Sequence, residues 1–308
     1  MGDAVSGGPV VILAGGTGGA KLARGMLDVV GGDELVVIAN TGDDIEIYGS
    51  YVSPDPDLVT FWLADRIDER GWGLNGDTFQ VMDGLRELGL DVWFNLGDRD
   101  LAICLERARR LQRGERPTEA QQAVTAALGV TARVLPMADQ PVRTRVLADG
   151  TWASLQEFLI RRRGQGDVQD VDFRGRGDAR PSPEVLEAIA TARAIVIGPS
   201  NPVISIGPIL SVPGLRDAIT ASRARTVAVS PIVRGAVVKG PTEAFMRWQG
   251  QSLDAAGIAA VYAPLLDGMV ADESSSSLPS LEIDTLMDSA DSRRQLAENT
   301  LSFALGLS

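Results

Sequence analysis

Residues 9–27 read PVVILAGGTGGAKLARGML, a strand, a glycine turn and a helix in direct succession. The apolar run Val10–Leu13 predicts a buried strand, and the apolar residues from Leu22 onward recur at helical spacing. A glycine turn between strand and helix lets an anion approach the backbone and the free N–H groups of the helix N-terminus. The stretch therefore predicts a phosphate site, with these candidate residues: Gly15, Gly16, Thr17, Gly18, Gly19 and Lys21.

The turn matches neither of two common phosphate-binding signatures. A Walker loop has glycine directly before its lysine, whereas Ala20 precedes Lys21 here. The dinucleotide fingerprint places its third glycine where this chain has Lys21. The glycine cluster thus indicates a phosphorylated ligand without identifying it, and a merely tight turn is the alternative.

Composition limits the classes of function. The 308 residues suffice for one α/β domain over residues 1–308, and a hydrophobic content of 44% is ordinary for a globular protein. A net charge of −12 argues against binding to nucleic acid or anionic membranes. Because residues 1–8 are too polar for a signal peptide and no apolar run approaches a membrane span, we expect a cytoplasmic protein.

The chain has no histidine and a single cysteine, Cys104. Serine and cysteine hydrolase machinery that depends on histidine is therefore excluded, as are His-ligated metal sites and intrachain disulfides. Carboxylates, Lys, Arg, hydroxyls, backbone N–H groups and a hard metal ion remain available for catalysis.

An acidic loop, residues 40–57, follows the second predicted strand, Leu35–Ala39. The strand completes a βαβ unit, so the loop begins at the sheet edge where α/β proteins bind ligands. Asp43 and Asp44 follow the strand directly, and we favour metal or proton chemistry for both. Asp55 has a second interpretation as a helix cap, and the whole loop could be a solvated acidic surface.

Three later segments add candidate residues and a structural expectation. A short strand is predicted at Val92–Phe94, and Arg99 after it is a candidate phosphate or carboxylate donor that could instead pair with neighbouring aspartates. Charged residues 140–180 suggest an inserted lobe. Gly198–Ile206 predicts a non-helical segment at a strand end, where Ser200 and Asn201 suit ligand contact.

Together, an ordered set of stretches resembles the 2-phospho-L-lactate transferase and phosphoenolpyruvate transferase family of coenzyme F-420 biosynthesis. The stretches are AGGTGGAKL at 14–22, NTGDD with SPDPD at 40–57, WGLNGDT at 72–78, FNLGDRD at 94–100, GPSNPVISIGPIL at 198–210, and VAVSPIV with KGP at 227–241. They span the chain from Val10 to Pro241 in order.

The resemblance implies an α/β, modified Rossmann-like three-layer fold with a parallel core sheet and an inserted helical or mixed lobe. It implies transfer of a phospho-acyl unit from a guanosine diphosphate-linked donor to the ribityl hydroxyl of the deazaflavin Fo, with release of GMP and dependence on Mg²⁺. Known donors carry lactyl, enolpyruvyl or glyceryl groups, and a homodimer is expected.

We assign roles on this basis. Asp44 and Asp57 are predicted to act as Mg²⁺ ligands or as the base toward the ribityl hydroxyl, because the chain lacks a histidine base. The predicted metal ligands are Asp43, Asp44, Asp55 and Asp57, and the predicted donor-binding residues include Asn40, Arg99, Ser200 and Asn201 besides the glycine turn.

Two departures from the family pattern affect the acceptor. Tyr48 stands where the family commonly has histidine, and SPDPDLV at 53–59 replaces the more usual SPDLDT. The same chemistry on another acceptor is one alternative. A non-catalytic regulator that binds nucleotide sugars is another, although LGDRD at 96–100 and the stretch at 200–210 favour the transferase.

Overall fold

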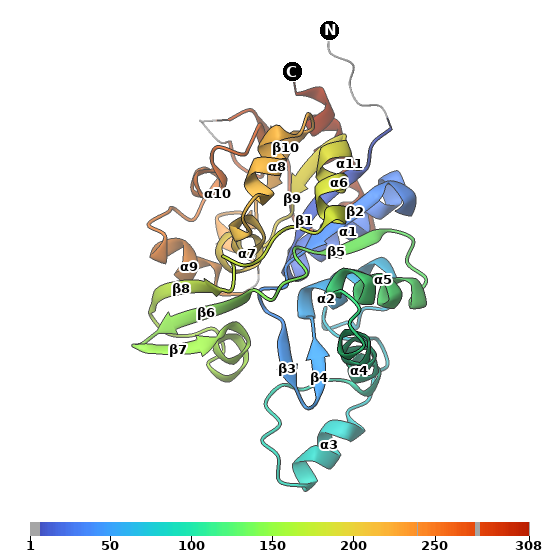
Figure 1. The fold of residues 1–308 in the computed structure, drawn as a ribbon. Helices are drawn as coiled ribbons and strands as arrows, with labels where there is room; N and C mark the ends of the chain where they lie inside the picture. The colour runs from blue at the N-terminus through green and yellow to red at the C-terminus, as the bar shows by residue number, and fades with distance from the viewer. Residues whose placement is uncertain (1–6, 239, 275–277, 308) are drawn as a thin grey trace.

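A computed structural model describes residues 7–238, 240–274 and 278–307. Its centre is a seven-stranded sheet in which every neighbouring pair is parallel, with the order β14-β13-β10-β9-β1-β2-β5 (Figure 1). The strands are β1 (Val10–Ala14), β2 (Leu35–Ala39), β5 (Arg133–Pro136), β9 (Ala194–Ile197), β10 (Arg225–Val229), β13 (Gly268–Ala271) and β14 (Ser280–Glu282).

The central strand β1 is buried on both faces because helices cover both sides of the sheet. Val11 and Leu13 belong to one apolar core, whereas Val10, Ile12 and Ala14 belong to the other. This explains why the strand is a continuous apolar run rather than an alternating one.

The helices form two outer layers, which gives the predicted three-layer α/β fold. One layer holds α1 (Gly16–Val30), α2 (Pro54–Leu63) and α11 (Ala290–Gly306). The other holds α6 (Pro183–Thr191), α7 (Gly207–Ser211), α8 (Leu215–Ala221) and α10 (Ala255–Tyr262). Helix α5 (Pro117–Ala127) lies beside β5. Helix α9 (Thr242–Trp248) lies next to β8 (Val168–Arg174), a strand outside the central sheet.

The order in which successive strands are added to the sheet reverses at the boundary between β1 and β9. From β1 the chain continues to β2 and β5 on one side, then returns to β9, β10, β13 and β14 on the other. In open α/β sheets, the carboxyl ends of the strands at such a reversal are the usual position for a ligand.

A separate three-stranded antiparallel sheet lies within the segment for which we predicted an inserted lobe. It comprises β6 (Arg143–Ala148), β7 (Thr151–Ser154) and β8 (Val168–Arg174). The π-helical turn η2 (Glu157–Arg161) connects β7 to β8. The core of this sheet joins Phe158 to Phe245 of α9, with ring centroids 5.9 Å apart. The domain boundaries at 140 and 180 stay a prediction.

A second satellite core surrounds a hairpin formed by part of the acidic loop. The hairpin strands are β3 (Ile45–Ile47) and β4 (Ser50–Val52), and α3 (Gln80–Glu87) and α4 (Asp98–Gln112) complete the unit. The predicted strand at Val92–Phe94 is wrong, because this segment is a loop. Its apolar side chains pack on the hairpin, and Phe94 N donates to Tyr48 Oη at 3.2 Å.

The remaining short elements are the 3₁₀ turn η1 (Gly32–Glu34), the π-helical turn η3 (Pro202–Ile206), and the hairpin strands β11 (Ile232–Val233) and β12 (Ala236–Val237). No helix among the described residues combines the length and the apolar character needed to cross a bilayer.

The packing of α1 against α11 depends on a glycine. A Cβ at Gly25 would lie 2.3 Å from the carbonyl oxygen of Arg293, whereas a Cβ at Gly84 in α3 would meet nothing within 4 Å. We predict that Gly25→Ala lowers the free energy of unfolding by about 1–3 kcal/mol, since α11 must move away.

The matched Gly84→Ala variant should raise the free energy of unfolding by about 0.5–1 kcal/mol, because alanine restricts the unfolded chain and favours the helix. Urea denaturation of both variants measures the difference. Equal stabilisation by both substitutions would contradict the close approach of α1 and α11.

Candidate functional site

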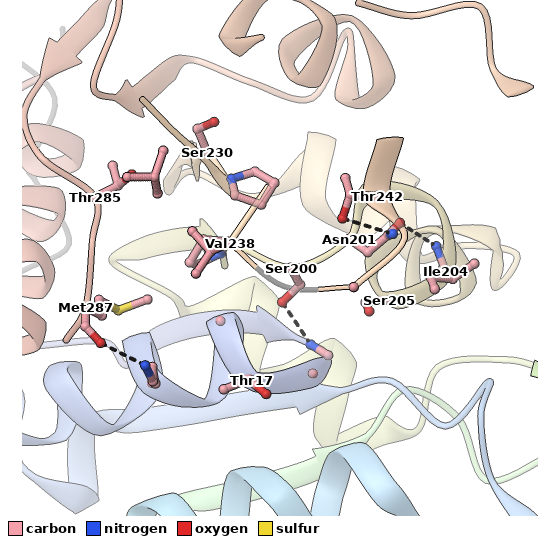
Figure 2. A pocket seen from close by; sticks show the side chains of 18 of the residues that line it. Thr17, Ser200, Asn201, Ile204, Ser205, Ser230, Val238, Thr242, Thr285 and Met287 are labelled. Atoms are coloured by element: carbon pink, nitrogen blue, oxygen red, sulfur yellow. Dashed lines mark hydrogen bonds between the residues drawn. The ribbon is translucent and has the colours of Figure 1, made fainter. Parts of the chain in front are cut away.

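A cavity of about 370 Å³ opens at the carboxyl ends of β1, β9 and β10, next to the point where the strand order reverses (Figure 2). Its volume falls in the range of small-molecule sites. Its walls come from the start of α1, the loops after β9 and β10, and a C-terminal segment after β14. The lining residues are Gly15, Gly16, Thr17, Gly18, Lys21, Leu159, Pro199, Ser200, Asn201, Ile204, Ser205, Ser230, Pro231, Val233, Val238, Gly240, Pro241, Thr242, Thr285, Leu286 and Met287.

The N-terminus of α1 forms one wall of this cavity, as the glycine turn predicts. Gly16 has φ of 65°, a backbone conformation that favours glycine. Gly15 N donates to Ser200 Oγ at 3.3 Å, and Gly16 N donates to Asp55 Oδ1 at 2.5 Å. Side chains of the protein therefore already engage two of the amides that we assigned to phosphate.

The glycine turn packs so closely against the loop after β9 that two more of its positions have no room for a side chain. A Cβ at Gly18 would lie 1.9 Å from Pro199 O, and a Cβ at Gly19 would lie 2.7 Å from Ser200 Oγ. Gly18 lines the cavity, but Gly19 is buried behind it. Both glycines thus bring α1 against the loop, which places Ser200 beside the helix N-terminus.

Lys21 lines the cavity and is held by neighbours. Its Nζ donates to Met287 O at 2.8 Å and lies 5.8 Å from the centroid of the Trp62 ring. The ammonium group is therefore positioned between α1 and the C-terminal segment, where it can also reach an anion in the cavity. Lys239 of the KGP stretch lies outside the described residues.

Asn201 lines the cavity as the start of a helical turn. Its Oδ1 accepts from the amides of Val203 and Ile204, and its Nδ2 donates to Thr242 Oγ1 at 3.3 Å. The expectation that Gly198–Ile206 is non-helical is wrong for its second half, because Pro202–Ile206 forms η3. The reason is local: proline suits a first helical position, and the asparagine caps it.

Asp43 and Asp44 are both buried where the acidic loop leaves β2. Asp44 accepts from Ser53 Oγ at 2.7 Å and from Tyr51 Oη at 2.9 Å. Asp43 Oδ2 accepts from Gln156 Nε2 at 3.1 Å, and its Oδ1 has no hydrogen-bond partner within the described parts of the chain. Gln156 and Tyr51 belong to no recognisable sequence pattern, so neither could be predicted as a partner of these aspartates.

Asp55 connects the acidic loop to the glycine turn. Besides the Gly16 amide, it accepts from Asn40 Nδ2 at 2.8 Å, and Asn40 Oδ1 in turn accepts from Gly42 N. Asn40 does not line the cavity but orients this carboxylate at its edge. The alternative of Asp55 as a helix cap is partly realised, because it caps α1 rather than its own helix α2.

Asp57 forms a buried ion pair with Arg107 of α4. Arg107 donates to both carboxylate oxygens, with the Nη1–Oδ2 distance at 3.0 Å, and also to Gln121 Oε1. Both side chains are at most 4% exposed. The roles predicted for Asp57, as metal ligand or base, must therefore compete with this guanidinium.

Burial dominates the electrostatics of the four aspartates and raises the pKa of each. The pKa of Asp44 rises to about 7, although Arg143 and its hydrogen bonds oppose the shift. The pKa of Asp55 rises to about 6. Asp43 also has a raised pKa, first through burial and then through repulsion from Asp55 and Asp44. A cation near these carboxylates would relieve both costs.

Asp43, Asp44 and Asp55 offer the carboxylate oxygens that a hard cation prefers, and Asp43 Oδ1 lacks a partner among the described residues. Their ligand atoms do not form a group within 4.8 Å of one another in those parts of the chain. Among those residues, the compact metal-ligand group is a different one: Asp57, Asp100 and Cys104, with ligand atoms within 4.8 Å. Its thiol and the adjacent Arg107 suit Mg²⁺ poorly.

Arg99 and Tyr48 lie away from the cavity. Arg99 is exposed at the start of α4, where its amide donates to Asp77 Oδ1 at 2.9 Å. Tyr48 has φ of 51° and precedes Gly49 at 73°, so the pair forms the tight turn between β3 and β4. The structure does not bring either residue to the lining, and a phosphate contact for Arg99 stays a prediction.

Comparison with known proteins gives a consistent result. A family model described as 2-phospho-L-lactate transferase CofD matches residues 10–298. A Methanosarcina mazei protein named 2-phospho-L-lactate transferase is 38% identical, over 94% of this chain and 98% of its own. A Kitasatospora aureofaciens protein named phosphoenolpyruvate transferase is 42% identical, over 85% of this chain and 84% of its own.

A crystal structure of a Bacillus halodurans protein of the UPF0052 family has a similar fold. The TM-score is 0.61 at 18% identity, over 96% of this chain and 99% of that one. At this identity the likeness concerns the fold alone.

The Asp57–Arg107 pair should carry a large share of local stability. Arg107→Met leaves a buried carboxylate without its counter-charge, and we predict a loss of about 3–5 kcal/mol in the free energy of unfolding. The control is Arg109→Met, which removes the exposed pair with Glu106 and should cost about 0–1 kcal/mol. Chemical denaturation measures both, and similar losses would refute a special role for the buried pair.

Stability should fall as pH rises from about 5 to 7 when divalent ions are chelated. The folded-state pKa of Asp44 at about 7 and of Asp55 at about 6 exceed the unfolded value of 3.8. The folded protein therefore binds more protons in this range, and raising the pH removes about 1–2 kcal/mol per group.

Melting temperatures across this pH range test the expectation. Asp44→Asn should flatten the profile, whereas Asp83→Asn on the exposed face of α3 should leave the slope unchanged. A wild-type profile that is flat from pH 5 to 7 would contradict the raised pKa values.

Proposed function

The chain belongs to the 2-phospho-L-lactate transferase family, and we propose that it transfers a phospho-acyl unit from a guanosine diphosphate-linked donor to the ribityl hydroxyl of Fo, releasing GMP, in coenzyme F-420 biosynthesis. One observation carries the proposal: the N-terminus of α1 opens on the cavity at the reversal point of the sheet. A helix N-terminus at that place suits the diphosphate of a nucleotide donor.

The charge of the site supports a phosphoryl-transfer reaction. The donor is anionic and the chain carries a net charge of −12, so binding needs local cations. Lys21 supplies one at the cavity wall. We propose that Asp43, Asp44 and Asp55 hold Mg²⁺, which would neutralise charge on the transferring phosphate.

Asp44 is our candidate for accepting the proton of the attacking hydroxyl. It is buried, Ser53 and Tyr51 fix both its oxygens, and burial raises its pKa to about 7. A bound Mg²⁺ would lower this pKa, and a carboxylate beside a metal ion can still accept a proton late in the reaction, as the attacking oxygen loses it. Asp57 lies in α2, and its ion pair with Arg107 supports a positioning role instead.

Two related acyl groups, lactyl and enolpyruvyl, are candidates for the acid that the donor carries. Relatives with similar identity to this chain bear the names 2-phospho-L-lactate transferase and phosphoenolpyruvate transferase. We therefore propose a phospholactyl or phosphoenolpyruvyl donor. We also propose that the protein forms a homodimer. Its partners in this proposal are the small-molecule donor and acceptor, and neither nucleic acid nor a membrane is a partner.

The decisive experiment incubates the protein with Fo, Mg²⁺ and each guanylated donor, and follows the products by mass spectrometry. The proposal expects a phospho-acyl-Fo product together with stoichiometric GMP from at least one donor. Nucleotide binding without any product would instead support the non-catalytic regulator.

Asp44→Asn tests the role of the acidic loop within that assay. We predict a fall in turnover of about a hundredfold or more, because the amide cannot accept the proton. GDP affinity measured by calorimetry without Mg²⁺ should stay within about twofold, since Asp44 does not line the cavity. Asp91→Asn, which changes an exposed carboxylate, is the control. Normal turnover of the Asp44 variant would remove this residue from the mechanism.

A further inference from the structure

A C-terminal segment that none of the sequence motifs covered closes the cavity on the side away from the glycine turn. Thr285, Leu286 and Met287 line it there, and Figure 2 shows Thr285 across the cavity from Thr17. The segment is held at both ends, since Leu286 N donates to Asp284 Oδ1 at 2.9 Å and Met287 O accepts from Lys21. Its position is therefore built into the fold.

The hydroxyl of Thr285 is an unusual feature of this wall. The residue is 3% exposed, and its Oγ1 has no hydrogen-bond partner among the described residues. Of the buried side-chain atoms that lack a partner in those parts of the chain, this is the one that belongs to a cavity-lining residue. An unpaired buried hydroxyl costs free energy, so such an atom calls for an explanation.

The surroundings indicate the kind of ligand group that would pair with it. The near wall offers the α1 N-terminus and Lys21, which suit phosphate, whereas Pro231, Val233 and Leu286 make the far wall apolar. Apolar walls with a few polar atoms are usual for small-molecule sites, and they suit a planar heterocycle, which has apolar faces and polar atoms at its edge. No hydrogen bond among the described residues holds the Thr285 rotamer, so a rotation of about 120° can turn the hydroxyl into the cavity.

We infer that Thr285 is a substrate-binding residue that hydrogen-bonds the purine base of the donor, with the diphosphate at the glycine turn and the base against the apolar wall. This inference rests on the proposed function, because it takes the donor to be a guanine nucleotide. The hydroxyl can donate or accept, so it contributes affinity at the base without distinguishing a carbonyl from an amino group.

The test compares two isosteric substitutions. Thr285→Val and Thr300→Val each remove a buried hydroxyl that lacks a partner among the described residues, but Thr300 lies on α11 and does not line the cavity. Neither substitution should lower the melting temperature of the ligand-free protein, since an apolar group replaces an unpaired polar one.

Calorimetry with GDP and with inorganic pyrophosphate then separates the outcomes. We expect Thr285→Val to weaken GDP binding about five- to tenfold while pyrophosphate affinity is unchanged. Thr300→Val should leave both affinities at the wild-type value, and Thr285→Ser, which keeps the hydroxyl, should restore most of the GDP affinity.

The inference is overturned if both valine variants bind GDP like the wild type, or if Thr285→Val weakens pyrophosphate as much as GDP. In either case the wild type still binds GDP, so the proposed function stands. A wild-type protein that binds no GDP overturns the inference and the proposed guanylated donor together.

Discussion

The buried carboxylate of Asp55 joins three segments that are distant in sequence, and the geometry of the site depends on it. It accepts from the Gly16 amide at the start of α1 and from the Asn40 side chain at the end of β2, while its own backbone begins α2. A negative charge at a helix N-terminus is favourable, which offsets part of the cost of burial. The same contacts bring the acidic loop to the edge of the cavity.

Two further networks attach the satellite units to the sheet through this loop. Arg107 of α4 pairs with Asp57, and Arg143 of β6 donates to Tyr51 Oη, which in turn donates to Asp44. Each connection satisfies buried polar groups that would otherwise destabilise the fold. Residues from both satellite units thereby help to fix the carboxylates without belonging to the glycine turn.

Local sequence patterns predicted the core well because burial on two faces produces continuous apolar runs. Val10–Leu13 and Leu35–Ala39 are strands as expected, and the glycine turn starts α1. The same reasoning failed at Val92–Phe94, where three apolar residues pack on a hairpin outside the sheet. Asn201 was expected to face a ligand, yet its side chain caps η3, since a short polar residue before proline also favours a helix start.

The α/β class, the glycine turn before α1 and the family could be predicted from the sequence, because these depend on local spacing and on motifs that occur in order along the chain. Tertiary structure alone decided which polar groups meet. Arg107 stands 50 residues from Asp57, and Thr285 lies in a segment with no recognisable motif, yet folding buries the first pair and puts the threonine on the cavity wall. Such contacts arise from packing between elements, and one-dimensional patterns do not encode which distant elements will touch.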